Sequence, residues 1–507
     1  MRRVFVFLTV LTICSCSLGD DFALQQQMRE MVVQNQVSEA LSLAKSEDLY
    51  DDKESSFLFY ADLGTLHYMK GEYYQALQYF DKAVERNKEL YTVSVSKTVA
   101  SNIVGDAAAD YPGTRYEASL LRFYQSLCHY HLAKNGVYEA YEKTVDGQIV
   151  QVPERKLTPD EVRLHTNAAR ATVIDWNSLL TTYMHENSGD AVYKQDLLAK
   201  VWGAFIHEKH GSGPDAQIAK QLYRDVDVFL TRNYNMYPAF NDKWEKYVDD
   251  YKKLPQKKQA DLKKNYIAET EHAKALTNAA KEAEKALKNK KNNVRVFMKT
   301  GLVGERYENM TTIPMDLAAI GLIFTDDPAF LAAMLTSPDI EISVPAIKKC
   351  QDIPAAGTYR LQVKNAKGKT VADKKMILVE PVTQIVCRDF DAGYKKMIAA
   401  KTARMTTKYA AALATAYAAK VAIDDDLWGS LAAGAAFSAA VAGINASEKA
   451  DLRYWAFLPD NIWFQAFSLP AGTYDYTIER NDAVVHTGTL EVPKKGFALA
   501  DVNLPAE

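Results

Sequence analysis

The sequence has no excess of charge of either sign. Its 507 residues include 61 Lys and Arg against 64 Asp and Glu, which gives a net charge of −3. A nucleic-acid-binding protein normally carries a basic surface that neutralises phosphates, so this balance argues against a nucleic-acid partner. With 25% charged and 48% hydrophobic residues, the composition is that of a soluble globular body of roughly two to four domains.

Long hydrophobic runs are scarce. Residues 427–446 (LWGSLAAGAAFSAAVAGINA) lack charge over about the length that spans a bilayer, but they are rich in Ala and Gly and only weakly hydrophobic. We therefore expect a buried helix that packs closely through its small residues, in preference to a re-entrant or membrane-touching helix.

Cysteine is rare, with five residues in the whole chain. Apart from Cys14 and Cys16 near the N-terminus, these are Cys128, Cys350 and Cys387. In an oxidising compartment an odd number permits one disulfide and one buried thiol. Cys350 and Cys387 flank a segment that we predict below to be a β-hairpin, so they are the better pair. None of the spacings matches a zinc site.

Recognisable catalytic motifs are missing as well. The sequence has no phosphate-binding Gly-rich loop and no Gly-x-Ser-x-Gly elbow. His207 and His210 would share one helix face and could hold a metal, but they lack the His-Glu-x-x-His spacing and a third ligand. We interpret them as exposed residues at a helix end, and we expect no catalytic residue, no metal and no cofactor.

The N-terminus has the pattern of an export signal. Arg2 and Arg3 precede an apolar stretch, Val4 to Ile13, that is too short to remain in a bilayer as a spanning helix. The following residues, through Cys16, resemble the lipobox of bacterial lipoproteins. Cys16 fits better than Cys14 because small Ser15 precedes it. We expect residues 1–16 to be a signal peptide and lipobox that anchor the chain by lipid at Cys16; an ordinary secretory signal is the alternative.

Residues 20–250 are predicted to form a tetratricopeptide-like helical repeat domain. The positions that carry the repeat pattern are Tyr60, Leu63, Gly64, His67, Gly71, Tyr73, Ala76, Phe80 and Ala83. Small Gly64 and Ala76 would let two antiparallel helices approach closely. A degenerate second copy places Tyr124, Leu127, Cys128, His131 and Ala140 at the matching positions. Further helices are expected at 164–185, 193–210 and 215–233.

The composition of the remaining chain changes twice, at about residues 251 and 293. Residues 251–292, dense in Lys, Glu and Ala, predict a long solvated helix. Residues 293–507 predict an α+β domain with a helical insert at 394–446. Its two β-hairpins open on Pro354 to Tyr359 and on Pro470 to Tyr474. The expected fold class is thus multidomain and mostly α: a helical solenoid, then an α+β domain with β-hairpins and an Ala/Gly-rich helical insert.

Three segments, 111–132, 294–303 and 450–474, resemble blocks of a family of bacterial tetratricopeptide-containing lipoproteins whose role is unassigned. The pattern that carries the resemblance is matched by Ala450, Asp451, Arg453, Trp455, Leu458, Pro459, Pro470 and Gly472. Gly304 departs from it, since a proline is expected there. The resemblance implies a location in the cell envelope. Arg453 and Trp455 taken by themselves are more often a buried polar partner and a core residue.

These observations favour an interaction scaffold that binds an unidentified envelope protein or peptide on its concave helical surface. The serine after the lipidated cysteine implies an outer-membrane lipoprotein facing the periplasm, or alternatively the cell surface. A structural subunit of a secretion or motility assembly and a periplasmic hydrolase with an unrecognised site are the alternatives. The sequence does not set the oligomeric state.

Overall fold

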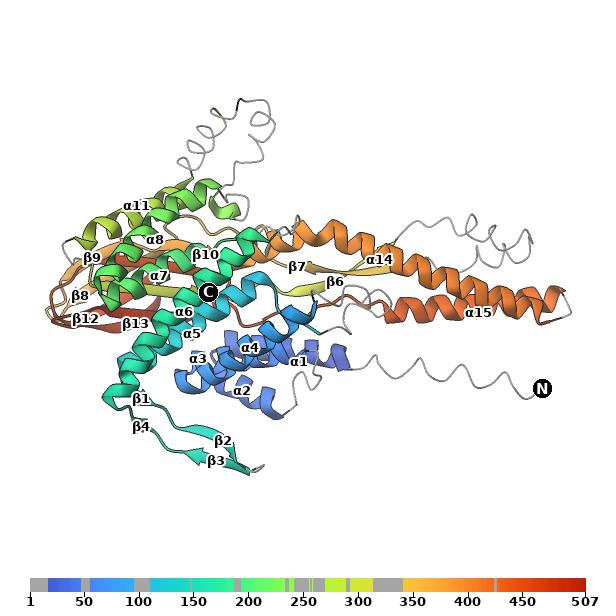
Figure 1. The fold of residues 1–507 in the computed structure, drawn as a ribbon, viewed down its shortest axis with the longest axis horizontal. Helices are drawn as coiled ribbons and strands as arrows, with labels where there is room; N and C mark the ends of the chain where they lie inside the picture. The colour runs from blue at the N-terminus through green and yellow to red at the C-terminus, as the bar shows by residue number, and fades with distance from the viewer. Residues whose placement is uncertain are drawn as a thin grey trace.

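The computed structural model describes residues 17–46, 55–94, 110–145, 148–186, 193–232, 237–240, 270–288, 292–312, 341–423 and 426–507, together with 255 and 258. The predicted signal segment 1–16, with Cys14 and Cys16, and most of 251–269 lie outside these residues. The described chain is a mixture of many helices and several small sheets (Figure 1).

The first part of the chain is built from helices that pack on their sequence neighbours. In order they are α1 (Ser17–Val33), α2 (Val37–Ser46), α3 (Ser56–Met69), α4 (Tyr73–Ser94), α5 (Arg115–Asn135), α6 (Pro159–His185), α7 (Leu197–His210) and α8 (Gly213–Arg232). The residues expected to fill the α3–α4 contact do so: Leu63, Ala76, Phe80 and Ala83 are fully buried. A Cβ atom on Gly64 would lie 2.6 Å from the Phe80 ring, so glycine is what allows this close approach.

The expected second repeat copy is wrong at its second helix. Tyr124, Leu127, Cys128 and His131 lie buried on α5 as predicted, but Ala140 is not helical. The chain instead leaves α5 at Gly136 and forms strands β1 (Val137–Tyr138), β2 (Tyr141–Val145), β3 (Gln148–Val152) and β4 (Arg155–Lys156). β1 pairs with β4 and β2 with β3, which gives a projecting ribbon before α6 (Figure 1).

Two four-stranded sheets form the α+β part. The first has the order β10 (Ile377–Pro381), β11 (Asn461–Phe467), β5 (Val294–Thr300) and β14 (Ala498–Leu504), with β14 parallel to β5. The second has the order β13 (Ala483–Val492), β12 (Gly472–Arg480), β8 (Tyr359–Asn365) and β9 (Thr370–Lys375). Both predicted hairpins are therefore present, and β8 pairs with β12 to join them in one sheet. A separate ribbon pairs β6 (Arg306–Thr312) with β7 (Glu341–Ile347).

The charged helix is shorter and less solvated than its composition indicated. In the described residues it is α11 (Glu271–Leu287), after the short 3-10 turn η4 (Pro238–Phe240). Ala273, Leu276, Ala280 and Ala283 are buried, and α11 packs on α8, β10 and β11. Its charged residues cover the outer side, while its apolar stripe completes the core.

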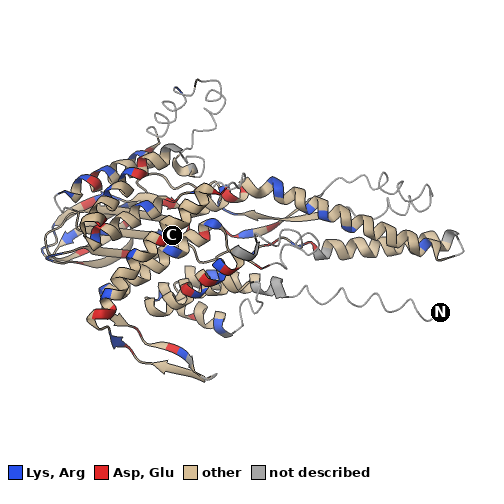
Figure 2. Cartoon of the chain, viewed as in Figure 1, with Lys and Arg blue, Asp and Glu red and all other residues tan. Residues whose placement is uncertain are grey.

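The helical insert is a long arm. α14 (Val382–Val421) begins before the expected Tyr394 and pairs with α15 (Asp426–Ser447). The arm extends away from the sheets and has its own small core around Met405, Tyr409 and Phe437 (Figure 1). Basic side chains are spread along α14, whereas α15 is almost free of charge (Figure 2). Among the described helices none is long and apolar enough to cross a membrane.

The helical array and the sheets share one hydrophobic core. A single cluster of buried apolar residues runs from Met28 on α1 to Val502 on β14. Within it, Trp202 of α7 packs edge-on against Phe297 of β5 at 5.3 Å between ring centroids. The parts that composition separates at residue 292 are thus packed together as one body.

Candidate functional site

A set of buried hydrogen bonds joins residues 451–460 to helices α1, α3 and α5. We call these ten residues, all within the described chain, the docked segment; they run without helix or strand. Trp455 at its centre is fully buried. Its indole Nε1 donates a hydrogen bond to Thr65 Oγ1 of α3 at 2.9 Å, and its backbone N–H donates to Glu117 Oε1 of α5 at 2.9 Å.

Neighbouring backbone groups of the docked segment are also satisfied by helix side chains. The Ala456 N–H donates to Asp62 Oδ1 at 3.0 Å, and the Tyr454 carbonyl accepts from Gln25 Nε2 at 3.3 Å. Arg29 of α1 donates to the Ala456 carbonyl and, at 2.7 Å, to the Val303 carbonyl. Helix side chains that bind the backbone of a segment without helix or strand are what a peptide-binding surface requires.

Burial changes the protonation of the carboxylate at this contact. Burial raises the pKa of Asp62 to about 8, against hydrogen bonds from Ala456 and Gln25 that lower it. A carboxyl with this pKa is mostly protonated at neutral pH, so it can donate as well as accept a hydrogen bond. Glu117 is held by Tyr111 Oη at 2.9 Å and by the Thr114 N–H at 2.7 Å.

The residues that carry the resemblance described from the sequence lie mainly in this contact. Arg453 is 6% exposed, binds both carboxylate oxygens of Asp451 at 2.9 Å, and lies over the Tyr111 ring. Pro459 is buried at the end of the segment, whereas Gly472 is exposed as the first residue of β12. Arg453 and Trp455 are thus a buried polar partner and a core residue, and the helix face on which we expected a partner is covered by the chain itself.

A second buried polar cluster connects helices α3 and α5 to strands β5 and β14 of the first sheet. The Asp501 carboxylate on β14 contacts Lys299 of β5, His131 Nε2 of α5 at 2.8 Å, and the Tyr68 hydroxyl of α3. Burial alone would raise the pKa of Asp501, but Lys299 and His131 lower it well below its usual range. The Lys299, Asp501 and His131 side chains are 3 to 7% exposed, so the cluster is closed to solvent and structural.

The two histidines considered as metal ligands face a carboxylate instead. His207 Nδ1 and His210 Nδ1 lie 2.6 and 2.7 Å from the Asp215 carboxylate, which Arg170 also contacts at 2.7 Å. His207 is 2% exposed, so the expectation that both are exposed was wrong for it. Among the described residues, no group of three His, Cys, Asp or Glu side chains is placed to hold a metal ion.

The cysteines adopt the arrangement that the sequence favoured. Cys350, in the turn after β7, forms a disulfide with Cys387 near the start of α14, with the Cα atoms 5.8 Å apart. Cys128 is a buried free thiol on α5, and burial raises its pKa well above the usual value. A buried, protonated thiol is inert, so Cys128 is a packing residue.

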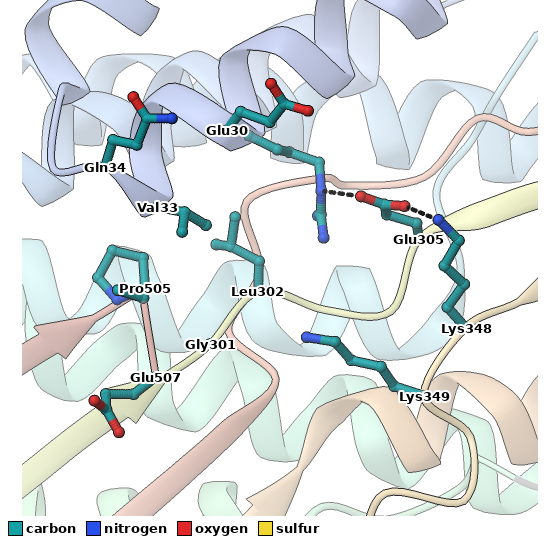
Figure 3. Close-up of a pocket in the computed structure, with 12 residues that line it drawn as sticks. Glu30, Val33, Gln34, Gly301, Leu302, Glu305, Lys348, Lys349, Pro505 and Glu507 are labelled. Carbon is teal, nitrogen blue, oxygen red and sulfur yellow. Dashed lines mark hydrogen bonds and ion pairs between the residues drawn. The ribbon is translucent and has the colours of Figure 1, made fainter.

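Hollows formed by the described residues lie beside the helical array, and two of them bear on function. A groove of about 260 Å³ lies between α2, α3, α4 and the β2–β3 ribbon. It is lined by Ala44, Lys45, Phe59, Leu63, Gln75, Tyr79, Glu142 and Ile149. A cavity of about 470 Å³ lies where α1 meets the turn after β5 and the turn after β7 (Figure 3).

Comparison with known proteins gives no relative: no family model, no curated protein and no solved structure matches the chain.

Proposed function

We propose that the protein is a lipid-anchored interaction scaffold of the bacterial cell envelope, without catalytic activity, in which α1 to α8 act as a tetratricopeptide-like array that holds extended polypeptide. The observation that carries this proposal is the docked segment. Helices α1, α3 and α5 bind its backbone through Gln25, Arg29, Asp62 and Glu117. Helices that bind the backbone of one irregular segment have the hydrogen-bonding side chains needed to bind another polypeptide segment.

The partner surface in this proposal is the groove between α2, α3, α4 and the β2–β3 ribbon. Ile149 at its edge is 69% exposed, and the ring of Tyr79 forms part of its wall. Two buried atoms near that ring have no hydrogen-bond partner among the described residues: Gln75 Oε1 and His67 Nε2. His67 stacks on Tyr79 with ring centroids 5.3 Å apart.

The protonation of His67 follows from its contact with Glu72. His67 Nδ1 lies 2.6 Å from Glu72 Oε2. Burial would raise the pKa of Glu72, but His67 and Lys70 lower it to about 2, so this carboxylate is ionised and Nδ1 must donate. Burial also lowers the pKa of His67, which leaves Nε2 as a bare acceptor at neutral pH. Of the two unpartnered acceptors, only Gln75 Oε1 belongs to a residue that lines the groove, and it favours a partner that presents an N–H group there.

The groove can be tested by capture from native envelopes. Full-length protein carrying Ile149→Asp should lose one specific crosslinked envelope protein that the unaltered chain retains. Val228→Asp is the control, because Val228 is also an exposed apolar residue, at 45%, but lies on α8. Circular dichroism should first show that both variants are folded. The same capture profile for all three chains would contradict binding through the groove.

The lipid anchor is tested separately. Cys16→Ala should move the chain from the membrane pellet to the soluble fraction and remove incorporation of a labelled fatty acid, whereas Cys14→Ala should change neither. Retention of both properties by the Cys16 variant would exclude Cys16 as the anchor.

One observation favours a second candidate, a structural subunit of an envelope assembly. Val421, Trp428 and Leu431, close to the chain reversal between α14 and α15, are 66, 64 and 55% exposed. A helix that is apolar on all sides is normally covered. If the arm is an assembly contact, Leu431→Asp should lower the mass measured by light scattering; an unchanged monomeric mass in both chains would reject this candidate.

A further inference from the structure

The cavity in Figure 3 has the form of a small-molecule site. Its walls come from the end of α1, the turn after β5, the turn after β7, and residues 505–507. Its volume of about 470 Å³ lies within the usual range for ligand pockets, which often form where parts of a protein meet. One side is apolar, formed by Val33, Leu302 and Pro505, and the other carries charged side chains.

Most of these charges are already paired. The Glu305 carboxylate contacts Lys348 Nζ at 2.6 Å and Arg29 Nε at 3.7 Å. Glu507 Oε2 accepts from Arg480 at 2.9 Å. Lys349 has no ion-pair partner among the described residues, and its ammonium points into the cavity, while the Glu30 carboxylate points away from it (Figure 3). The cavity therefore presents one unpaired cation opposite an apolar wall.

The backbone of Lys349 supports a role for its side chain. Its φ angle of 64° is in the left-handed region, which side chains other than Asn, Asp and Gly adopt at a cost. The next residue, Cys350, is fixed to α14 by the disulfide with Cys387. Strained backbone that the surrounding structure holds in place is frequent at binding sites.

We propose that this cavity binds a monocarboxylate with an aliphatic body. The carboxylate lies at Lys349 Nζ and the aliphatic part packs on Val33, Leu302 and Pro505. A dianion such as phosphate is disfavoured because the C-terminal end of α1 contributes negative potential and, among the described lining residues, Lys349 alone supplies an unpaired positive charge for it. The same chemistry is offered by a fatty acid and by the C-terminal residue of a peptide.

Isothermal titration calorimetry on the full-length protein separates these sources. The probes are hexanoate, N-acetyl-Leu-Val with a free carboxylate, and their neutral analogues hexanol and the dipeptide amide. At least one carboxylate should bind about tenfold more tightly than its neutral analogue, as one charge-assisted contact provides. Preference for hexanoate identifies a fatty acid, and preference for the dipeptide identifies a peptide terminus.

Two substitutions make the test specific. Lys349→Asn, which tolerates the left-handed backbone, should remove the preference for the charged probe, whereas Lys367→Asn on the exposed β8–β9 turn should keep it. Val33→Asp should weaken binding of the carboxylates while leaving the fold intact, since Val33 is 42% exposed. Equal binding of charged and neutral probes, no binding at millimolar concentration, or an unchanged preference in Lys349→Asn would overturn the proposal.

Discussion

Trp455 is the single residue on which the contact between the docked segment and the helices depends most. Its indole is fully buried against Phe80 and Tyr124 and donates to Thr65. Trp455→Ala should therefore lower the free energy of unfolding by about 3–5 kcal/mol, as other buried aromatic truncations do. Trp428→Ala is the matched control and should change it by less than about 0.5 kcal/mol, because Trp428 is 64% exposed. Urea denaturation measures both, and equal losses would contradict the assignment.

Asp62 should give the molecule a pH-dependent stability. Its folded pKa of about 8 is above the ordinary value of 3.8, so its contribution to stability is present below about pH 4 and is lost as the pH rises toward 8. Asp62→Asn keeps the hydrogen bond to Ala456 without this titration. The free energy of unfolding of the unaltered chain, relative to Asp62→Asn, should fall by up to about 1.4 kcal/mol per pH unit through that window. Parallel stability curves would show that Asp62 is ionised in the folded protein.

At the residue scale, the sequence predicted what depends on near neighbours. The repeat positions from Leu63 to Ala83 and the Cys350–Cys387 pair follow from spacing and from the hairpin between the cysteines. The docked segment could not be predicted in this way, because Trp455 and Thr65 are 390 residues apart in the chain. The available signal was Asp62, a carboxylate on an otherwise apolar helix face, which needs a partner once it is buried.

In the α3–α4 pair, Gly64 tests whether close packing of the two helices or the helix propensity of the residue decides its effect on stability. Gly64→Ala should lower the free energy of unfolding by about 1–3 kcal/mol, because the new Cβ would overlap the Phe80 ring. Gly443→Ala on α15 should instead raise it by roughly 0.5–1 kcal/mol, since no atom lies within 4 Å of the new Cβ and alanine favours helix. Thermal unfolding of the two variants should thus shift in opposite directions; a shift of the same sign would reject the packing explanation.

Helices and strands were predicted correctly where the residues that end them were recognised in the sequence. The prediction was wrong where such a residue was overlooked. The β8–β9 and β12–β13 hairpins turn at Gly368 and at Asn481-Asp482, all with positive φ. The second repeat copy failed because Asn135-Gly136 ends α5: Gly136 adopts φ 66° as a left-handed cap, four residues before Ala140. The pairing of β8 with β12 joins the two hairpins. It could not be predicted, because the alternation of apolar and polar residues within one strand does not specify which distant strand pairs with it.

For the whole molecule, composition indicates a boundary near residue 292, but the shared core indicates one cooperative body. Asp501 and Lys299 on the sheet contact His131 and Tyr68 on the helices, and these side chains are buried. If one part is removed, the polar groups of the other lose their partners, which is costly. Fragments 17–292 and 293–507 should therefore fail to unfold cooperatively when purified alone.

Co-expression of the two fragments should restore a folded complex, because β5, β14 and the docked segment regain their helix partners. The measurement is co-elution on size exclusion followed by thermal unfolding, in which the complex should show one transition. Trp455→Ala in the second fragment should weaken co-elution more than Trp428→Ala, since only Trp455 lies at the junction between the fragments. A cooperative transition from fragment 293–507 alone would instead make it an independent domain, and the docked segment would then be a detachable contact between two domains.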